Sequence, residues 1–332
     1  MRRITGCLPL AAALLVLAGC GDDSGGGSAS ETTTPTAEAS DQPAAEATDE
    51  PADEPADEPA SEAACADGPP EAVVTDPGDE PRTLMELSPT AGATTAIDMR
   101  MTVNSTMSLD GQEAPSTPTP TMIMGMTLTV DDVTDDEITM SVTYDRVEVE
   151  GGDPTLQGLL DSMVGITGTV TTTRSGAFVD GKMDTSGVDP TLAPTMQQID
   201  SQLANLTVPL PTEPVGAGAT WEVATALDSQ GFAFCNTFSY TLTSFDGDAY
   251  ELAVETVQHA EPTTIEQGGA SVELIEGSGS GTGTTGGRLS FPIAVSGSTD
   301  SNTSIAMAVD DGSTEQTLEM DMAIQMELSP RE

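Results

Sequence analysis

The residues that carry most enzyme chemistry and most nucleic-acid binding are scarce in this 332-residue sequence. It holds one histidine, His259, and one tryptophan, Trp221, and aromatic residues make up 3% of the chain. A nucleophilic triad normally needs a histidine base. Only 9 Lys and Arg stand against 55 Asp and Glu, and a net charge of −46 repels nucleic acid. We therefore expect no catalytic residues, no cofactor and no nucleic-acid partner.

Motifs of other active sites are also missing. The sequence has no Gly-x-Ser-x-Gly elbow and no Cys-x-x-Cys or His-x-x-x-His zinc spacing. The glycine-rich run Gly277 to Gly287 lacks the Gly-Lys-Ser/Thr ending of a phosphate-binding loop, and we expect a flexible hairpin loop there. His259 is expected at an exposed strand end. We predict no metal ligands, since the acidic turn Asp131 to Glu137 lacks EF-hand spacing and favours a solvated turn over a calcium site.

The N-terminus has the features of an export signal. Arg2 and Arg3 precede an apolar stretch, Leu8 to Ala18, which is shorter than the roughly 20 residues that a bilayer requires. The stretch ends in Leu17-Ala18-Gly19-Cys20, which resembles the bacterial lipobox. The resemblance implies diacylation of Cys20 and cleavage before it, so that the mature protein is anchored on the extracytoplasmic face of the cell membrane. The alternative is an ordinary signal peptide followed by an unrelated cysteine.

An acidic, proline-rich segment follows the lipobox. From Gly21 to Pro81 there are 18 Asp and Glu residues and no Lys or Arg, and Asp-Glu-Pro-Ala occurs three times within Asp49 to Ala60. Repelling charges and proline disfavour any packed structure. We predict a signal peptide over residues 1–19, a lipidated spacer over 20–82 and one β-rich extracytoplasmic domain over 83–332. An acidic ligand for a basic partner is the alternative function of the spacer.

Two cysteines remain outside the signal peptide and the lipobox. Cys65 and Cys235 form an even pair in an oxidising compartment, which favours a disulfide bond. Two independent thiols are the alternative. We expect a monomer.

Alternating hydrophobic residues predict β-strands throughout the domain. One parity is apolar and the other polar, which is typical of an antiparallel sheet with one wet face. The apolar positions are Ile97, Met99, Met101 and Val103; Met122, Met124, Met126, Leu128 and Val130; Ile138, Met140, Val142 and Tyr144; and Leu318, Met320, Met322, Ile324, Met326 and Leu328.

Two segments with helical spacing interrupt the strands. Asp153-Pro154 resembles a helix start, and apolar residues then recur with helical spacing up to Gly165. Asp189-Pro190 opens a second stripe, formed by Leu192, Met196, Ile199, Leu203 and Leu206. We therefore predict an α+β domain in which a large curved antiparallel sheet carries two helices on its apolar face.

Two predicted hairpins are alike in sequence. Leu128 to Val142 and Tyr240 to Val254 align at a constant offset, with apolar residues at matching positions around an acidic turn. The likeness raises the hypothesis of two related halves within one continuous sheet. Hairpins also resemble each other for generic reasons, so the alternative stays open.

One motif resembles a known group of proteins. The run Pro209 to Trp221 is similar to a Pro…Val-Gly…Trp turn of uncharacterised secreted lipoproteins from high-GC Gram-positive bacteria, a family without an assigned activity. At the level of fold alone, a curved sheet covering helices behind a lipobox resembles the lipoprotein-localisation (LolA-like) architecture, whose members carry lipids or lipoproteins in an apolar cavity. No motif matches that second group residue by residue.

The apolar face of the predicted sheet is rich in methionine, a flexible side chain that adaptable binding surfaces favour. The candidate ligand-binding residues are Met99, Met101, Met122, Met124, Met126, Met140, Met320, Met322 and Met326. They predict a non-enzymatic lipoprotein that binds or carries an apolar, lipid-like ligand. The alternative is a structural or interaction protein of the envelope, with a filled core and an acidic surface that meets a partner.

Overall fold

The computed structural model describes residues 70–114, 120–151, 157, 160–184, 207–229, 232–267, 270–310, 312 and 314–331. The chain divides into two units, Met1–Glu62 and Ala63–Glu332, and the first lies outside the described residues. The second unit contains one antiparallel sheet of 14 strands. The strands are β1 (Ala72–Asp76), β2 (Thr94–Leu109), β3 (Gln112–Glu113), β4 (Thr121–Val133), β5 (Glu137–Glu150), β6 (Thr167–Thr173), β7 (Phe178–Met183), β8 (Thr220–Ser229), β9 (Phe232–Phe245), β10 (Ala249–Ala260), β11 (Thr263–Gln267), β12 (Ala270–Arg288), β13 (Phe291–Asp310) and β14 (Glu315–Pro330).

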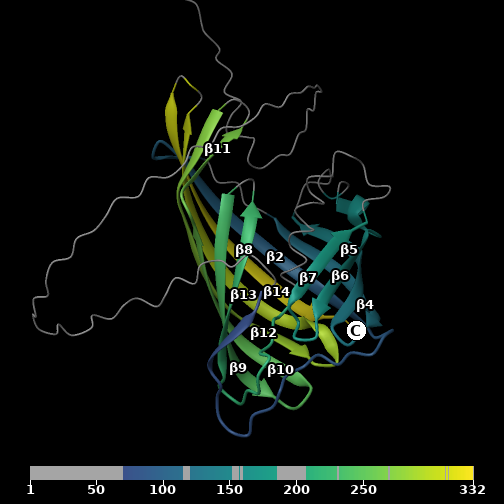
Figure 1. Cartoon of the computed structure of the whole chain (residues 1–332). Helices are drawn as coiled ribbons and strands as arrows, with labels where there is room; N and C mark the ends of the chain where they lie inside the picture. Colours follow the sequence, from purple (N-terminus) through teal and green to yellow (C-terminus); the bar gives the residue numbers. More distant parts are fainter. Residues whose placement is uncertain are drawn as a thin grey trace, which may run out of the picture. The chain divides into compact units, whose positions relative to one another are not determined.

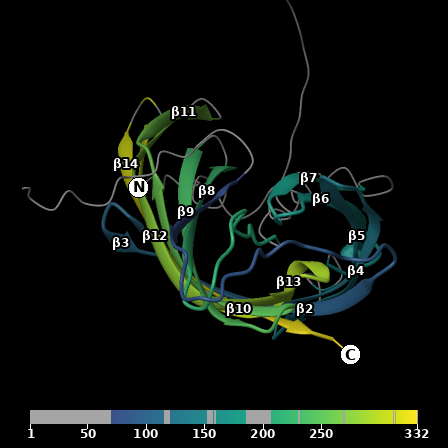
Figure 2. The same cartoon turned by 60° about the horizontal axis from the view of Figure 1, so that its bottom comes forward.

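The strand order places the C-terminal strand of the domain beside β2, near its N-terminal end. Along the sheet the order is β1-β8-β9-β10-β12-β13-β14-β2-β4-β5-β6-β7, with β11 beside β12 and β3 beside β2. The last strand, β14, therefore lies between β13 and β2. Figures 1 and 2 show that the sheet curls. We call concave the face on which Ile97 and Met101 lie, because Ile97 packs there in the main hydrophobic cluster. The predicted large antiparallel sheet is confirmed, and it begins at Ala72, within the stretch that we predicted as spacer.

The predicted α+β class is wrong, because strands dominate the described residues. Near the first predicted helix, the only complete helical element described is a 3-10 turn, η1 (Asp161–Met163). The turn ends because Gly165 N–H donates to Tyr144 O (2.7 Å), which returns the chain to the sheet. Val164, expected on the buried stripe, is 46% exposed. The second predicted helix, with Leu192 and Met196, lies outside the described residues.

The expected flexible loop at Gly277 to Gly287 is also wrong. These residues belong to β12, which pairs with β10 on one side and with β13 on the other. Hydrogen bonds to two neighbouring strands hold this backbone in place, although glycine weakens an isolated strand. The glycines also let neighbouring side chains approach closely, as described below.

Two connecting segments cross the concave side at one end of the sheet. We call residues 77–93 the first strap and residues 207–219 the second strap. They pair with each other where Thr83 N–H donates to Val215 O (2.8 Å) and Val215 N–H donates to Thr83 O (3.0 Å). Gly216 allows this approach, since a Cβ there would lie 1.7 Å from Asp79 O. The straps therefore cover this end of the concave face.

Each strap also reaches distant strands. In the first strap, Leu87 N–H donates to Arg174 O beside β6 (2.9 Å), and Ser88 N–H donates to Leu289 O between β12 and β13 (2.7 Å). In the second, Leu210 N–H donates to Ser175 O (2.7 Å). Leu87 and Leu210 are buried in the main hydrophobic cluster together with side chains from both arms of the sheet, by which we mean β4 to β7 at one end and β8 to β10 at the other. The straps thus join the two arms through backbone bonds and a shared core.

The two similar hairpins have the same strand register. In β4–β5, Val130 pairs with Met140 and Asp132 with Thr139, which leaves Asp131 as a bulge. In β9–β10, Leu242 pairs with Leu252 and Ser244 with Glu251, which leaves Thr243 as the bulge. Each pair of equivalent positions differs by the offset that aligns the two sequences. This agreement favours two related halves over a generic likeness.

A second element is repeated ahead of each hairpin. The tetrapeptide Ala-Gly-Ala-Thr occurs at 91–94, leading into β2, and at 217–220, leading into β8. Gly92 N–H donates to Val130 O (2.7 Å), and Gly218 N–H donates to Leu242 O (2.9 Å). Both glycines have positive φ, 85° and 76°, which explains glycine at these turns. The halves are therefore β2 to β7 and β8 to β13, and β14 joins them.

Candidate functional site: the concave face of the sheet

Strand register brings the predicted methionines together on the concave face. Met101 of β2 lies opposite Met122 of β4 on one side and Met326 of β14 on the other. Met99 lies opposite Met124 and Leu328. Because directly opposite residues point to the same side of a sheet, these side chains form continuous apolar rows across three strands.

Burial divides the nine methionines into two groups. Met124, Met126 and Met140 are fully enclosed in the main hydrophobic cluster and therefore act as core residues. The other six are partly exposed, and Met326 is the most open, at 37%. The more accessible candidates are thus Met99, Met101, Met122, Met320, Met322 and Met326. They lie on β2, β4 and β14, and Met320 lies toward a second hydrophobic cluster built around Leu274 and Met307.

Two further apolar residues of this face were not among the candidate ligand-binding residues. Met107 lies opposite Met320 and packs against the second cluster. Ile324 lies opposite Val103, between the rows of Met322 and Met326. The alternation that selected Met99 and Met101 continues to Met107, so that signal was present in the sequence.

Uncharged polar side chains cross the concave face on the β9–β13 side, and sequence reasoning missed these as well. Gln258 of β10 donates through Nε2 to Asn236 Oδ1 of β9 (2.9 Å). Thr303 of β13 donates through Oγ1 to Gln258 Oε1 (3.2 Å). We call Asn236, Gln258 and Thr303 the polar bridge. All three are part-buried, and the bridge separates the apolar rows around the two clusters.

Among the described residues of the strands, the concave face carries no charged side chain, in contrast to the acidic composition of the chain. The strand register shows which residues share the face of Met101 on β2, β4, β5, β8 to β10 and β12 to β14. None of the described residues on that face is Asp, Glu, Lys, Arg or His. The charged residues of these strands alternate onto the convex face, where Ser304 donates to Asp321 (2.6 Å) and Gln325 to Asp300 (2.9 Å). The charged residues described on these strands are therefore kept off the methionine rows.

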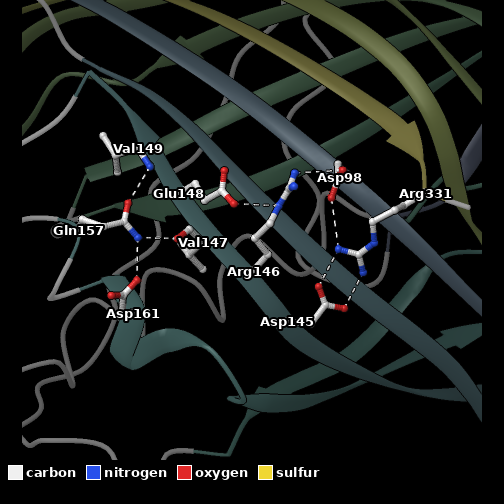
Figure 3. Close-up of polar contacts among 9 residues, drawn as sticks. All are labelled: Asp98, Asp145, Arg146, Val147, Glu148, Val149, Gln157, Asp161 and Arg331. Carbon is white, nitrogen blue, oxygen red and sulfur yellow. Dashed lines mark hydrogen bonds and ion pairs between the residues drawn. The ribbon is translucent and has the colours of Figure 1, made fainter.

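The convex face holds the densest ion-pair cluster (Figure 3). Arg331 donates to both carboxylate oxygens of Asp145 (2.7 and 2.6 Å) and approaches Asp98 (3.4 Å). Arg146 pairs with Asp98 (3.1 Å) and Glu148 (3.7 Å). The hydrogen bond from Arg331 is the main reason that the pKa of Asp145 lies below 3.8. These contacts fasten the chain after β14 to β2 and β5.

The ion pairs leave an acidic surface. All six described arginines contact a carboxylate: Arg82, Arg100, Arg146, Arg174, Arg288 and Arg331. Since acidic residues greatly outnumber basic ones, most carboxylates of the domain have no cation beside them.

Gln157, which precedes η1 in the chain, makes a different kind of contact. Gln157 accepts a hydrogen bond from Val149 N–H (3.0 Å) and donates to Val147 O (2.9 Å) and Asp161 (2.7 Å), as Figure 3 shows. Its amide thus bonds the edge of β5 beyond the end of β6, as a neighbouring strand would. This contact is structural.

Several other predicted positions lie away from the concave face. Cys20 and Cys65 lie outside the described residues. Cys235 is buried on β9, opposite Ala226 and His259, with its side chain on the convex side. His259 is part-buried within β10, near its end, rather than fully exposed.

The acidic turn between β4 and β5 is held by hydrogen bonds within the hairpin and by Arg174, which donates to Thr134 O (3.3 Å) and Asp136 O (3.2 Å). Asp131 accepts from Ser141 (3.2 Å), and Thr134 caps Glu137 N–H (2.9 Å). Within the described ranges no group of three or more His, Cys, Asp or Glu is arranged to hold a metal ion. In the same ranges, no helix has the length and apolarity needed to cross a membrane.

Trp221 explains the local structure of the Pro209 to Trp221 motif. Its indole N–H donates to Pro209 O (3.0 Å) within the core, and its ring stacks on Tyr240 (centroids 5.6 Å apart). The motif therefore closes on itself and places the second strap against β8 and β9.

Part of the chain resembles a known protein family. No curated protein matches the chain. Residues 195–286, which contain Trp221 and most of β8 to β12, are similar to a family described as a family of unknown function (DUF6263).

Proposed function

We propose that this protein is a non-enzymatic, lipid-anchored carrier or receptor that binds an apolar, lipid-like ligand on the concave face of its sheet. The observation that carries the proposal is the segregation of charge. A chain of net charge −46 presents a concave face without charged residues, and methionines line part of it. Flexible, polarizable side chains suit ligands of variable shape.

The degree of exposure supports binding over complete packing in one region. Met326 is 37% exposed, and Met101 and Met322 beside it are partly exposed. By contrast, Met124, Met126 and Met140 belong to a filled core, and they are excluded from the proposed site. The proposed contact region is therefore centred on Met101, Met322 and Met326.

Two kinds of experiment test this proposal. Residues 20–332 carrying Cys20→Ser, purified natively, are extracted with organic solvent and examined by mass spectrometry for lipid. Absence of any co-purifying lipid would count against the carrier. The substitution removes the anchor, so its acyl chains cannot be mistaken for a ligand.

Direct binding is measured with the neutral fluorophore N-phenyl-1-naphthylamine. Met326→Asp places a charge on the concave face and should weaken binding by at least about tenfold, since an unpaired charge under an apolar ligand costs more than 1.4 kcal/mol. Val257→Asp is the matched control, because Val257 is 59% exposed on the convex side of β10. Equal binding by the two variants would contradict the proposed location.

The anchor itself is part of the proposal. The charged start, apolar stretch and lipobox-like ending at Cys20 support diacylation and an extracytoplasmic location. Metabolic labelling with an alkyne fatty acid should mark the wild-type chain and not Cys20→Ala. Labelling of both would place any lipid elsewhere.

We also propose a disulfide bond between Cys65 and Cys235. Ala72 of β1 lies opposite Val223, which lies opposite Phe238 on β9. Ala72 is separated from Cys235 by two strand spacings across the sheet and by three residues along β9, which together amount to about 14 Å. The chain from Ala72 to Cys65, when extended, spans up to about 24 Å. The bridge is therefore within reach and would fasten the spacer to β9.

A second candidate function is interaction with a basic partner. The acidic convex face, on which Arg100, Arg146 and Arg331 are already paired with carboxylates, favours it. Binding that persists in Met326→Asp and disappears at high salt would favour this second function over ligand carriage.

A further inference from the structure

The polar bridge joins side chains that are two strands apart. Gln258 lies on β10 and Thr303 on β13, and β12 runs between them. Neighbouring strands are about 4.8 Å apart, so the backbones of β10 and β13 lie about twice that distance apart. The two side chains therefore meet over β12. The residue of β12 beneath them is Gly279, opposite both Gln258 and Thr303.

Glycine at position 279 is required for this contact. A Cβ there would lie 2.9 Å from Thr303 Oγ1 and 3.1 Å from Gln258 Oε1. The next concave position of β12, Gly281, lies opposite Thr256 and Ser301. Two successive rows thus place uncharged polar side chains around a bare backbone, within an otherwise largely apolar face.

The bridge retains hydrogen-bonding capacity toward the concave side. Gln258 uses Nε2 toward Asn236 and Oε1 toward Thr303. The bond to Asn236 uses its Oδ1, and the amide Nδ2 is a further donor. The hydroxyls of Thr256 and Ser301 are both donors and acceptors. Such a set suits a hydroxyl or ester group and supplies no charge for an anionic headgroup.

We infer that the polar bridge recognises the uncharged polar group of an amphiphile whose hydrocarbon chain lies along the methionine rows. This inference rests on the proposed function and names the ligand class of the same face. The negative charge of the domain disfavours anionic amphiphiles, and the absence of cations on the face removes any compensating contact. A neutral acylglycerol fits these conditions, whereas a fatty acid anion does not.

The test uses two probes with the same chain, 1-lauroylglycerol and laurate at pH 8. Each displaces N-phenyl-1-naphthylamine from residues 20–332 carrying Cys20→Ser. We expect 1-lauroylglycerol to compete at a concentration about tenfold lower than laurate, as expected for hydrogen bonds made by the neutral head alone. Equal competition by the two probes would overturn the inference.

Variants locate the recognition. Gln258→Leu should abolish the preference for 1-lauroylglycerol while the fluorophore still binds. Gln325→Leu removes a glutamine from the convex face, where it donates to Asp300 (2.9 Å), and should keep the preference. Thr303→Val, which nearly preserves shape, serves as the second variant should Gln258→Leu fail to fold. An unchanged preference in a folded bridge variant would contradict the inference.

The outcomes separate the two proposals. Failure of the wild-type chain to bind the fluorophore would overturn the proposed function and this inference together. Fluorophore binding without a preference between the probes would overturn this inference alone.

Discussion

At the scale of single residues, Trp221 shows how one side chain organises a connection. Its N–H group is buried and bonds Pro209 O, and its ring packs beside Tyr240. The only tryptophan of the chain therefore lies in the core that joins the second strap to β8 and β9. Its contacts therefore serve packing in this part of the core.

Trp221→Phe tests that role. The change leaves Pro209 O buried without its donor and should lower the free energy of unfolding by about 1–3 kcal/mol. Urea denaturation followed by circular dichroism measures the loss. The control is Phe245→Leu, a change at a partly buried aromatic position in β9. A Trp221→Phe variant as stable as the wild type would show that the bond contributes nothing.

Asp145 makes stability depend on pH in the acid range. Because Arg331 lowers its pKa below 3.8 in the folded protein, the ionised carboxylate stabilises the fold above pH 3.8. This contribution is lost as pH falls through the folded-state pKa. The pair is partly exposed, so we expect only about 0.2–1 kcal/mol.

The corresponding experiment compares the wild type with Asp145→Asn in urea at pH 7 and at pH 2.5. The variant should be less stable at pH 7, and the difference should shrink at pH 2.5. Asp300→Asn is the control, since Asp300 accepts from the neutral Gln325. A difference that is constant with pH would show that the ion pair is not its source.

At the scale of elements, β12 shows why a glycine-rich run can be a strand. Its glycines at 277, 279, 281 and 283 alternate onto the concave face, while residues between them point to solvent. Close neighbours on β10 and β13 leave no room for side chains on that parity. A glycine-rich composition predicts a loop. The segment forms a strand because it is hydrogen-bonded to β10 on one side and to β13 on the other.

Gly283→Val measures this crowding. A Cβ at Gly283 would lie 2.2 Å from Ser298 O, a backbone atom that cannot move independently, so we expect a loss of about 1–3 kcal/mol. Ser280→Val, on the exposed parity of the same strand, should change stability by less than about 0.5 kcal/mol. Thermal unfolding of both variants tests this, and equal melting temperatures would contradict the packing argument.

At the scale of the whole molecule, β14 and the straps decide how the halves are joined. β14 is the last strand in the chain but pairs with β13 and β2, so it connects the second half to the first. Arg331 then bonds Ala96 O through its backbone N–H (2.8 Å). Strand order therefore depends on contacts between residues more than two hundred positions apart.

The proposed Cys65–Cys235 bond belongs to this scale as well. In the chain-entropy model, a bridge closing a loop of this length stabilises the fold by up to about 5 kcal/mol. Peptide mapping after alkylation without reduction should recover the two cysteines in one linked peptide, and Cys235→Ala should melt at a lower temperature. Recovery of both cysteines alkylated would rule out the bridge.

For β2, β4, β5 and β14 the sequence by itself determined that a strand forms and which residues share a face, because apolar and polar side chains alternate along these segments. Alternation at Met99, Met101 and Met122 therefore placed them correctly. Only the tertiary structure decided that Met124 is core while Met326 is partly exposed, since burial depends on what remote segments cover. The polar bridge over Gly279 was equally invisible, because it joins positions 236, 258 and 303 through neighbouring strands rather than through local spacing.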